Sequence, residues 1–398
     1  MSEAEKKVPE LRFKEFNERW VKKRLNESCT FFSGGTPTSS NKNYYDGNIP
    51  FIGSGNIHHK EVESFITKEA LQHSSAKLVE KGDLLYALYG ANSGDVAISE
   101  IKGAINQAIL CIRTEELNIY FVALLLSYNE NKIVARYLQG GQGNLSAKIV
   151  KNLKFYFPSF PEQQKIADFL SAVDQKIQQL QRKKELLEQY KKGMMQNLFA
   201  QEIRFKQEDG SDFPDWEEKK LGHFLQERSE YPDKELPLYS LTIENGIVPK
   251  TDRYERSFLV KDNRKAYKVM RQNDFAFNPM NLRYGALARH KENKVVSVSK
   301  YYNIFYCNEF ANNLYFETYL TSYNMIQYYN KMATGSLEEK KRVHYLDFIN
   351  FNLRFPSLLE QQKIANFLSA LDEKVEKVGQ QIEKAQEFKK GLLQKMFI

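Results

Sequence analysis

The hydrophobic pattern is most regular in two long stretches that repeat each other. Residues 157–199 and 355–397 align without a gap at an offset of 198 (355 − 157), and a self-match at so long a period indicates an internal duplication. In both stretches apolar residues recur at spacings of three and four, which predicts a coiled-coil seam. We predict two helices of about 38 residues, or about 57 Å at ~1.5 Å per residue. An amphipathic helix lying on a single domain would be unusually long.

The predicted seam combines the apolar heptad positions of the two stretches. Its residues are Ile166, Leu170, Val173, Ile177, Leu180, Leu187, Ile364, Leu368, Leu371, Val375, Val378 and Ile382.

Both helices begin at the same four-residue signal. Ser159 precedes Glu162 by three positions, and Ser357 precedes Glu360 in the same way. This spacing is typical of a capping box, in which the serine and glutamate side chains satisfy exposed backbone donors of the first turn.

A shorter repeat precedes each half of the chain. Residues 11–14 match residues 203–206, and Trp20 with its neighbours matches Trp216. Residues 208–211 form a turn-rich insertion in the second copy. We interpret the tryptophans as packing anchors rather than as binding residues.

Two globular units fill the remaining sequence, and their patterns are only faintly alike. Residues 273–277 align with 82–86, where both copies favour a strand, and a helix is expected over residues 120–137 and again over 315–331. The expected divisions are a linker segment (1–25), the first globular unit (26–156), the first long helix (157–200), the repeated linker (201–221), the second globular unit (222–354) and the second long helix (355–398).

Composition adds only broad limits. With 398 residues, 42% of them hydrophobic, the chain is long enough to bury two or three cores. Its three cysteines are far apart, which favours neither a disulfide framework nor a zinc site. No apolar run approaches ~20 residues, and the first residues lack a signal-peptide core, so a cytoplasmic location is expected. The net charge of +8 is compatible with a polyanionic partner.

The motifs of several enzyme classes are missing or incomplete. Residues 278–281 (Asn-Pro-Met-Asn) lack the second proline and the aromatic residue of an amino-methyltransferase loop. The glycine-rich residues 140–143 lack the lysine of a phosphate-binding loop. The pair His58 and His59 has no second ligand set at metal spacing. We therefore expect no catalytic residue, no metal site and no cofactor in this chain.

Several motifs carry a resemblance to a known family. The matched segments 158–170 and 356–368, with Gly35-Thr-Pro37 and Ser74-Ser-Ala-Lys77, resemble the specificity subunit of Type I restriction-modification enzymes over essentially the whole chain. The resemblance implies an α+β fold, with two globular target recognition domains separated by two long antiparallel coiled-coil helices related by a pseudo-twofold. It implies a non-catalytic subunit that recognises a bipartite, asymmetric double-stranded DNA target, one half-site per domain.

The resemblance also implies partners. Two modification (methyltransferase) subunits would bind S-adenosylmethionine and methylate adenine, and restriction subunits would use ATP and Mg²⁺ to translocate and cut DNA, with this chain as their scaffold. No membrane partner is implied. A specificity subunit of a related system that cuts on both sides of its site is an alternative, since the difference lies in the partner chains.

Candidate DNA contacts are polar and basic residues in the loops of the two globular units, because phosphates and base edges are contacted by such side chains. In the first unit they are Lys42, Tyr45, His58, His59, Lys60, Asn92, Ser93, Gln142 and Asn144. In the second unit they are Arg253, Lys265, Asn281, Arg283, Tyr284, Arg289, Lys341 and Arg342. Arg283 is the foremost candidate, since it follows a proline-containing turn beside Asn281.

Two other function classes stay open at this point. One is an enzyme subunit with a fused activity, which the missing catalytic motifs disfavour. The other is a coiled-coil interaction protein without DNA specificity, which two different basic, aromatic units on nearly identical helices disfavour.

Overall fold

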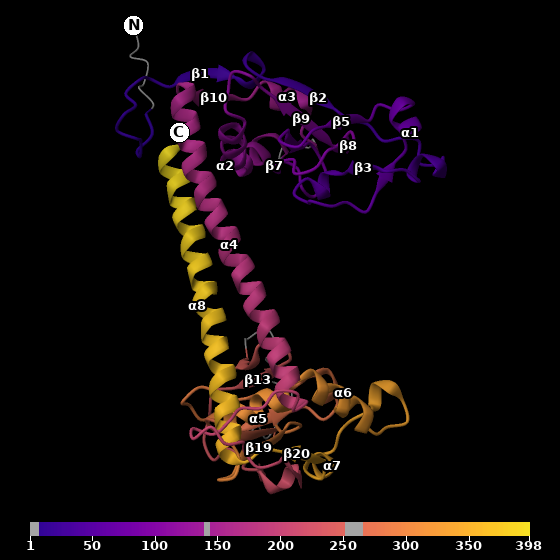
Figure 1. Cartoon of the computed structure of the whole chain (residues 1–398), viewed down its shortest axis with the longest axis vertical. Coiled ribbons are helices and arrows are strands. Elements are labelled where there is room, and N and C mark those ends of the chain that lie inside the picture. The colour runs from indigo at the N-terminus through magenta and orange to yellow at the C-terminus, as the bar shows by residue number, and fades with distance from the viewer. Residues whose placement is uncertain (1–7, 139–143, 251–265) are drawn as a thin grey trace. The chain divides into compact units, whose positions relative to one another are not determined.

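The chain folds into two compact units, each of which uses part of both long helices. A computed structural model describes residues 8–138, 144–250 and 266–398. The first unit contains residues up to Gln181 together with Gln380–Ile398, and the second contains Arg182–Gly379. Strands and helices are mixed in both, so the predicted α+β fold with two long helices is confirmed (Figure 1).

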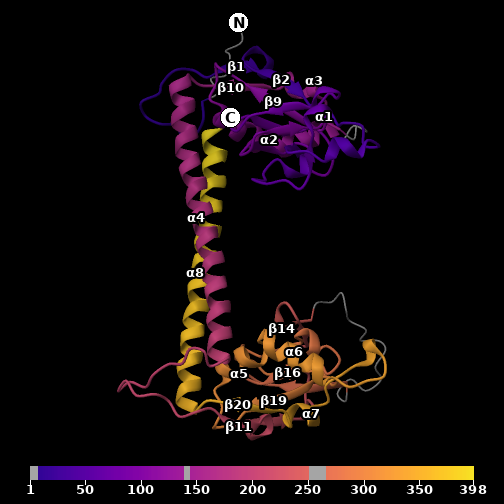
Figure 2. The same cartoon turned by 45° about the vertical axis from the view of Figure 1, so that its right-hand side comes forward.

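The two long helices are α4 (Phe160–Phe199) and α8 (Leu358–Met396), of 40 and 39 residues. Within each unit they run side by side in opposite directions (Figures 1 and 2). In the first unit, Ile166 and Leu170 near the start of α4 share a core with Leu392 near the end of α8. All the predicted seam residues are buried or half-buried. Burying a leucine or isoleucine contributes about 1.5–3 kcal/mol, so this seam is a main source of helix stability.

Lysines that interrupt the apolar heptads are paired across the helices. Lys389 lies 2.6 Å from Asp174 in the first unit, and Lys191 pairs with Asp372 in the second. The repeat offset relates both lysines (389 − 191 = 198) and both aspartates (372 − 174 = 198). The two ion pairs are therefore the same contact in the two halves.

The first unit is built on two four-stranded sheets. The first sheet has the antiparallel order β2-β9-β6-β7, and the second has the order β4-β3-β8-β5. Their strands are β2 (Thr30–Ser33), β9 (Ile109–Arg113), β6 (Leu84–Ala87), β7 (Val96–Ile98), β4 (Phe65–Ile66), β3 (Ile49–Ile52), β8 (Gly103–Ile105) and β5 (Lys77–Val79). The helices are α1 (Lys68–Gln72), α2 (Ile119–Leu138) and α3 (Ala147–Lys151). The apolar runs of β6 and β9 are buried on both faces, because alternate residues pack against α2 and α4 in one core and the residues between them pack against the second sheet in another.

The second unit repeats one of these sheets. The order β12-β19-β16-β17 has the same antiparallel pairing as β2-β9-β6-β7, and Figure 2 shows β16 and β19 together beside α5 and α6. The strands are β12 (Leu225–Arg228), β19 (Asn303–Cys307), β16 (Phe275–Phe277), β17 (Leu287–Arg289), and two separate pairs, β13 (Tyr239–Thr242) with β14 (Gly246–Pro249) and β15 (Tyr267–Met270) with β18 (Val296–Ser299).

The helix predicted over residues 315–331 is two helices, so that prediction was wrong in one respect. α5 (Asn313–Leu320) is followed by its C-cap residue Thr321, and α6 (Tyr323–Met332) begins after Ser322, whose side chain accepts a hydrogen bond from the backbone of Met325. The serine N-cap satisfies a donor of the new first turn and so favours a fresh start. A third helix, α7 (Tyr345–Ile349), follows.

A two-stranded sheet leads into each long helix. β1 (Val21–Arg24) pairs with β10 (Lys154–Phe157), which precedes α4. β11 (Glu217–Lys220) pairs with β20 (Asn352–Phe355), which precedes α8. The repeated linkers therefore return to the helix start of their own half.

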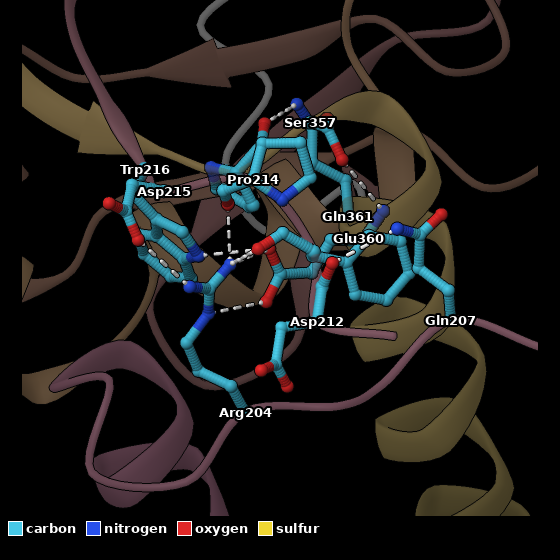
Figure 3. Close-up of polar contacts among 11 residues, drawn as sticks. Arg204, Gln207, Asp212, Pro214, Asp215, Trp216, Ser357, Glu360 and Gln361 are labelled. Carbon is cyan, nitrogen blue, oxygen red and sulfur yellow. Dashed lines mark hydrogen bonds and ion pairs between the residues drawn. The ribbon is translucent and has the colours of Figure 1, made fainter. Parts of the chain in front are cut away.

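A buried cluster joins linker and helix in the second unit (Figure 3). Glu360 in the first turn of α8 is 1% exposed, and it accepts hydrogen bonds from Arg204 (Nε to Oε1 3.1 Å, Nη2 to Oε2 2.9 Å) and from the indole of Trp216 (3.1 Å). Arg204 also donates to the carbonyl oxygens of Phe213 and Pro214. The glutamate is used differently from the predicted capping box, since its carboxylate binds side chains of the linker.

The first unit contains the same cluster. Glu162 is fully buried and accepts from Arg12 (both contacts 2.7 Å) and from Trp20 (3.3 Å). Both predicted tryptophan anchors are therefore packed and hydrogen-bonded. An arginine that meets a carboxylate with two parallel hydrogen bonds gives strong, directional pairing.

In both units the linker also contacts the C-terminal end of a long helix. In the second unit the backbone N–H of Ile203 donates to the carbonyl of Asn197 at the end of α4 (3.3 Å). In the first unit the N–H of Leu11 donates to the carbonyl of Lys395 at the end of α8 (2.8 Å). Residues 197 and 395 are equivalent (395 − 197 = 198), so one linker continues from its helix and the other docks onto a helix from the opposite end of the chain.

Candidate nucleic-acid interface

Five of the predicted contact residues of the first unit come from two segments of the chain, and one of them, Lys60, pairs with Glu100 beyond the end of β7 (3.1 Å). Three lie at or just after η3 (Ser54–Asn56), a short 3-10 helix, and two lie in the turn between β6 and β7. These residues are His58, His59, Lys60, Asn92 and Ser93.

Hydrogen bonds join these two segments. The His58 ring nitrogen lies 2.9 Å from both carboxylate oxygens of Asp95, and the side-chain amide of Asn92 donates to the carbonyl of Ser54 (3.4 Å). The turn is shaped by Gly94, whose φ of +97° favours glycine and whose position against Val134 leaves no room for a side chain. The result is one polar surface at the edge of the sheet.

The remaining predictions for the first unit fall elsewhere. Lys42 is exposed on η2 (Lys42–Tyr45), and Tyr45 donates its hydroxyl to the carbonyl of Pro37 (2.6 Å) while its ring packs against Phe51. Asn144 is exposed ahead of α3, and Gln142 lies outside the described residues. The structure therefore divides the predicted contacts of this unit into separate surfaces.

In the second unit most predicted contacts meet around η8 (Leu282–Tyr284), the turn after β16. Asn281, Arg283 and Tyr284 lie there, and Lys341 and Arg342 come from the loop 334–342 that packs against it. Arg253 and Lys265 lie outside the described residues. Tyr284 is 54% exposed, so an aromatic ring and a basic loop share this surface.

Two arginines predicted to contact DNA are engaged inside the protein. The Arg283 side chain is 3% exposed and forms an ion pair with Glu338. Arg289 on β17 is 11% exposed and contacts Glu317 (2.7 Å) and Asn273 (2.6 Å). A base-reading arginine needs a free guanidinium fork, so in this structure neither is placed for that role. The sequence around them gave no sign of these carboxylates, which come from residues 28 and 55 positions away.

An arginine, an aspartate and an aromatic ring support the sheet of the first unit at the end away from the polar surface. Arg113 on β9 donates through Nε to Asp83 (2.7 Å), and its guanidinium lies 5.0 Å from the ring centroid of Phe32 on β2. Burial would raise the pKa of Asp83, but the hydrogen bonds from Arg113 and the Glu80 backbone outweigh it and lower the pKa. The charged pair thus closes the end of β6 opposite the polar surface.

The second unit makes this support with two residues exchanged. Arg228 on β12 donates to Asp274 (2.7 Å) and lies 4.7 Å from the ring centroid of Tyr306 on β19. The strand registers make Tyr306 equivalent to Arg113, and Arg228 equivalent to Phe32. Both halves therefore make the same contact, but the strand that supplies the arginine in one half supplies the aromatic ring in the other.

The cysteines are poorly suited to nucleophilic chemistry. Burial raises the pKa of Cys29 to about 11 and those of Cys111 and Cys307 to about 12. A thiol needs to ionise to attack, so these side chains stay protonated near neutral pH. Among residues 8–138, 144–250 and 266–398, we find no cluster of three or more acidic, histidine or cysteine side chains arranged for a metal ion. In the same part of the chain no helix is long and apolar enough to cross a membrane.

The fold and surfaces define a duplicated α+β scaffold that carries two different polar surfaces. Known proteins that are similar to this chain have the same kind of scaffold. A family model described as "Type I restriction modification DNA specificity domain" matches residues 17–189. The MjaVIII specificity subunit of Methanocaldococcus jannaschii, from a Type I restriction enzyme, is 25% identical over 399 residues, which cover 92% of this chain and 90% of the relative. The MjaIX specificity subunit of the same organism is 27% identical, and the match spans 58% of this chain and 56% of that subunit.

A solved structure gives the same fold. The Type I restriction-modification S subunit from M. genitalium aligns over 98% of this chain and 99% of its own, with a TM-score of 0.59 at 15% identity. Residues 17–189 thus match the DNA specificity domain of Type I restriction-modification systems, and the chain as a whole is similar in sequence and in fold to the specificity subunits of such systems.

Proposed function

We propose that this chain gives a Type I restriction-modification complex its DNA specificity by recognising a bipartite, asymmetric target. Residues 26–156 form one target recognition domain and residues 222–354 the other, each for one half-site. The observation that carries the proposal is the duplicated sheet: β2-β9-β6-β7 and β12-β19-β16-β17 share one topology, while the surfaces where β6 and β16 end differ in residues. A common frame with different surface residues suits two different half-sites.

The same duplication supports a scaffolding role. The linker clusters at Glu162 and Glu360 and the two inter-helix ion pairs are the same in the two halves. Two equivalent surfaces suit two copies of one partner, which we infer to be the modification subunits. S-adenosylmethionine would be bound by those subunits, and ATP and Mg²⁺ by the restriction subunits. The long segments 157–200 and 355–398 would set the unread gap between the half-sites.

Exchange of one domain tests the proposal. Residues 222–354 are replaced by the corresponding segment of a specificity subunit with a known target, the chain is co-expressed with its modification subunits, and methylated adenines are mapped by sequencing. We expect one half-site to change while the other half-site stays the same. Exchange of residues 26–156 is the matched control and should change only the other half-site. Loss of both half-sites in a hybrid that still assembles would contradict the assignment.

A further inference from the structure

The loop 334–342 is a closed, basic element on the surface of the second unit. Thr334 and Arg342 exchange two backbone hydrogen bonds of 2.9 Å, which close the neck of the loop. Gly335 allows the chain to pass close to itself, because a Cβ there would lie 2.9 Å from the carbonyl oxygen of Lys340. The loop therefore has a defined shape and carries three successive basic residues, 340–342.

Arg283 holds this loop against η8. One guanidinium nitrogen pairs with the Glu338 carboxylate, and another donates to the Glu338 backbone carbonyl (2.7 Å). The other oxygen of the same carboxylate accepts from Lys341 (2.7 Å). Just beyond the neck, Val343 donates its N–H to the carbonyl of Pro279 (3.0 Å). Side-chain and backbone contacts thus fix the loop at two points.

Burial differs sharply between the two partners. The Arg283 side chain is 3% exposed, whereas that of Glu338 is 65% exposed. Arg283 also lies with its guanidinium 4.4 Å from the ring centroid of Tyr284, and its Nε is buried without a hydrogen-bond partner among the described residues. An arginine enclosed in this way can orient neighbouring groups but cannot reach a ligand. Lys340 and Arg342, in contrast, are exposed.

We propose that Arg283 is a positioning residue, which acts through Glu338 to hold loop 334–342 so that Lys340 and Arg342 contact DNA phosphates. The inference rests on the proposed DNA-binding function of the second unit. Phosphate contacts fix the register of a protein on the duplex without reading sequence. The loop would therefore place the nearby Tyr284 and Asn281 against the bases of one half-site.

The test is DNA binding by the assembled complex of this chain with its modification subunits, on duplexes carrying the mapped target, at several salt concentrations. Each phosphate contact contributes about 0.9 to the salt slope, so the double variant Lys340→Ala/Arg342→Ala should lower the slope by about 1.8. When salt is raised from ~50 to ~200 mM, the factor by which affinity falls should therefore be about ten times smaller for this variant than for the unaltered complex. Binding should weaken on every sequence, with base preference unchanged.

Glu338→Ala decides the role of Arg283. If Arg283 positions the loop, Glu338→Ala weakens binding and lowers the salt slope, as Arg283→Ala does, and the double variant Arg283→Ala/Glu338→Ala is no weaker than either. If Glu338 instead masks a base-reading Arg283, Glu338→Ala strengthens binding, and Arg283→Ala relaxes preference at one base pair. The second result would overturn the proposal. Glu338 is on the surface, so its variant remains informative even if Arg283→Ala impairs folding.

Glu339→Ala is the matched control. This substitution removes the same charge from the neighbouring position. It should leave the salt slope unchanged, and the complex should bind DNA as tightly as before or slightly more tightly. An equal loss of binding in both glutamate variants would overturn the positioning role. If the unaltered complex shows no preference for any target, the proposed function itself fails. If it is specific but the Lys340→Ala/Arg342→Ala variant is unchanged at every salt concentration, only the loop proposal fails.

Discussion

Replacement of Glu360 by alanine should destabilise the second unit strongly. The change leaves Arg204 and the Trp216 indole without the buried carboxylate that both contact. Removing one partner of a buried ion pair costs about 3–5 kcal/mol. Arg204 is 24% exposed and keeps hydrogen bonds to two backbone carbonyls, so we expect a loss near the lower end, about 3 kcal/mol.

The duplication supplies a second measurement of the same effect. Glu162→Ala removes the equivalent carboxylate from Arg12, which is only 13% exposed and keeps one carbonyl contact, to Glu18. The less exposed arginine has less access to water, so its loss should lie nearer the upper end, about 4–5 kcal/mol.

The assay uses the two tryptophans of the chain, because each donates to one of these glutamates. In a Trp20→Phe background, urea unfolding followed by fluorescence reports on Trp216 alone, and Trp216→Phe gives the converse. Glu360→Ala should lower the free energy of unfolding seen by Trp216. Glu373→Ala is the control: Glu373 is an exposed α8 residue 3.8 Å from Lys377, and such pairs contribute about 0–1 kcal/mol.

A loss below about 1 kcal/mol for Glu360→Ala, similar to the surface control, would refute this account of the buried pair. A second check replaces both partners. Arg204→Met/Glu360→Leu leaves no unpaired charge, and apolar replacements of buried pairs are often neutral. The double variant should therefore be more stable than Glu360→Ala alone, and a further loss of stability would contradict the reasoning.

Three other predictions concern the aspartate before β6, the connection of the chain ends and the length of the long helices. Asp83 has a lowered pKa in the folded chain, so its contribution is present at neutral pH and is lost as pH falls below about 4; Asp83→Asn should lower the urea midpoint at pH 7 and flatten its decline in acid, and an unchanged decline would contradict this. A circular permutant that joins the two termini and reopens the chain near Ser211 should still support methylation, because the first linker already docks on the end of α8. A permutant that folds but fails to assemble with the modification subunits would contradict this prediction. One heptad added between Leu180 and Leu187, and at the matching point of α8, lengthens each helix by about 10 Å. The mapped sites should then keep their half-sites and widen the gap by at most about three base pairs at ~3.4 Å each, or activity should fall. An active variant with the original gap would show that the helices do not set the gap.

The long helices could be predicted from sequence because their signal is local and repeated. A seam residue such as Leu170 or Leu368 is identified by its own neighbours at three and four positions, and the duplication presents the same pattern twice. The same holds for the strand at residues 82–86, whose match at 273–277 gave the correct equivalence of β6 and β16.

The contacts that the sequence did not reveal are those between distant polar residues. Glu162 fits a capping box locally, yet its carboxylate is taken by Arg12, 150 positions away. Arg283 looks like a base reader in its own turn, but Glu338 reaches it from another loop. A local pattern records which groups are available, while tertiary packing decides which partner each group meets.

The exchange of Arg228 and Tyr306 relative to Phe32 and Arg113 indicates how the two halves diverged. The sheet needs a cation beside the aspartate that ends the turn before β6 or β16, and an aromatic ring under that cation. Either of two facing strands can supply each part, so the residues are free to exchange while the contact persists. Beside the long helices, the two halves make the same contacts with the same residues. Within the sheet they make the same contact with the arginine and the aromatic ring exchanged between strands. At the surface turns both the residues and the contacts differ. Such a gradient supports the proposed function, in which the helices would bind the same partner twice and the two surface turns would contact different half-sites.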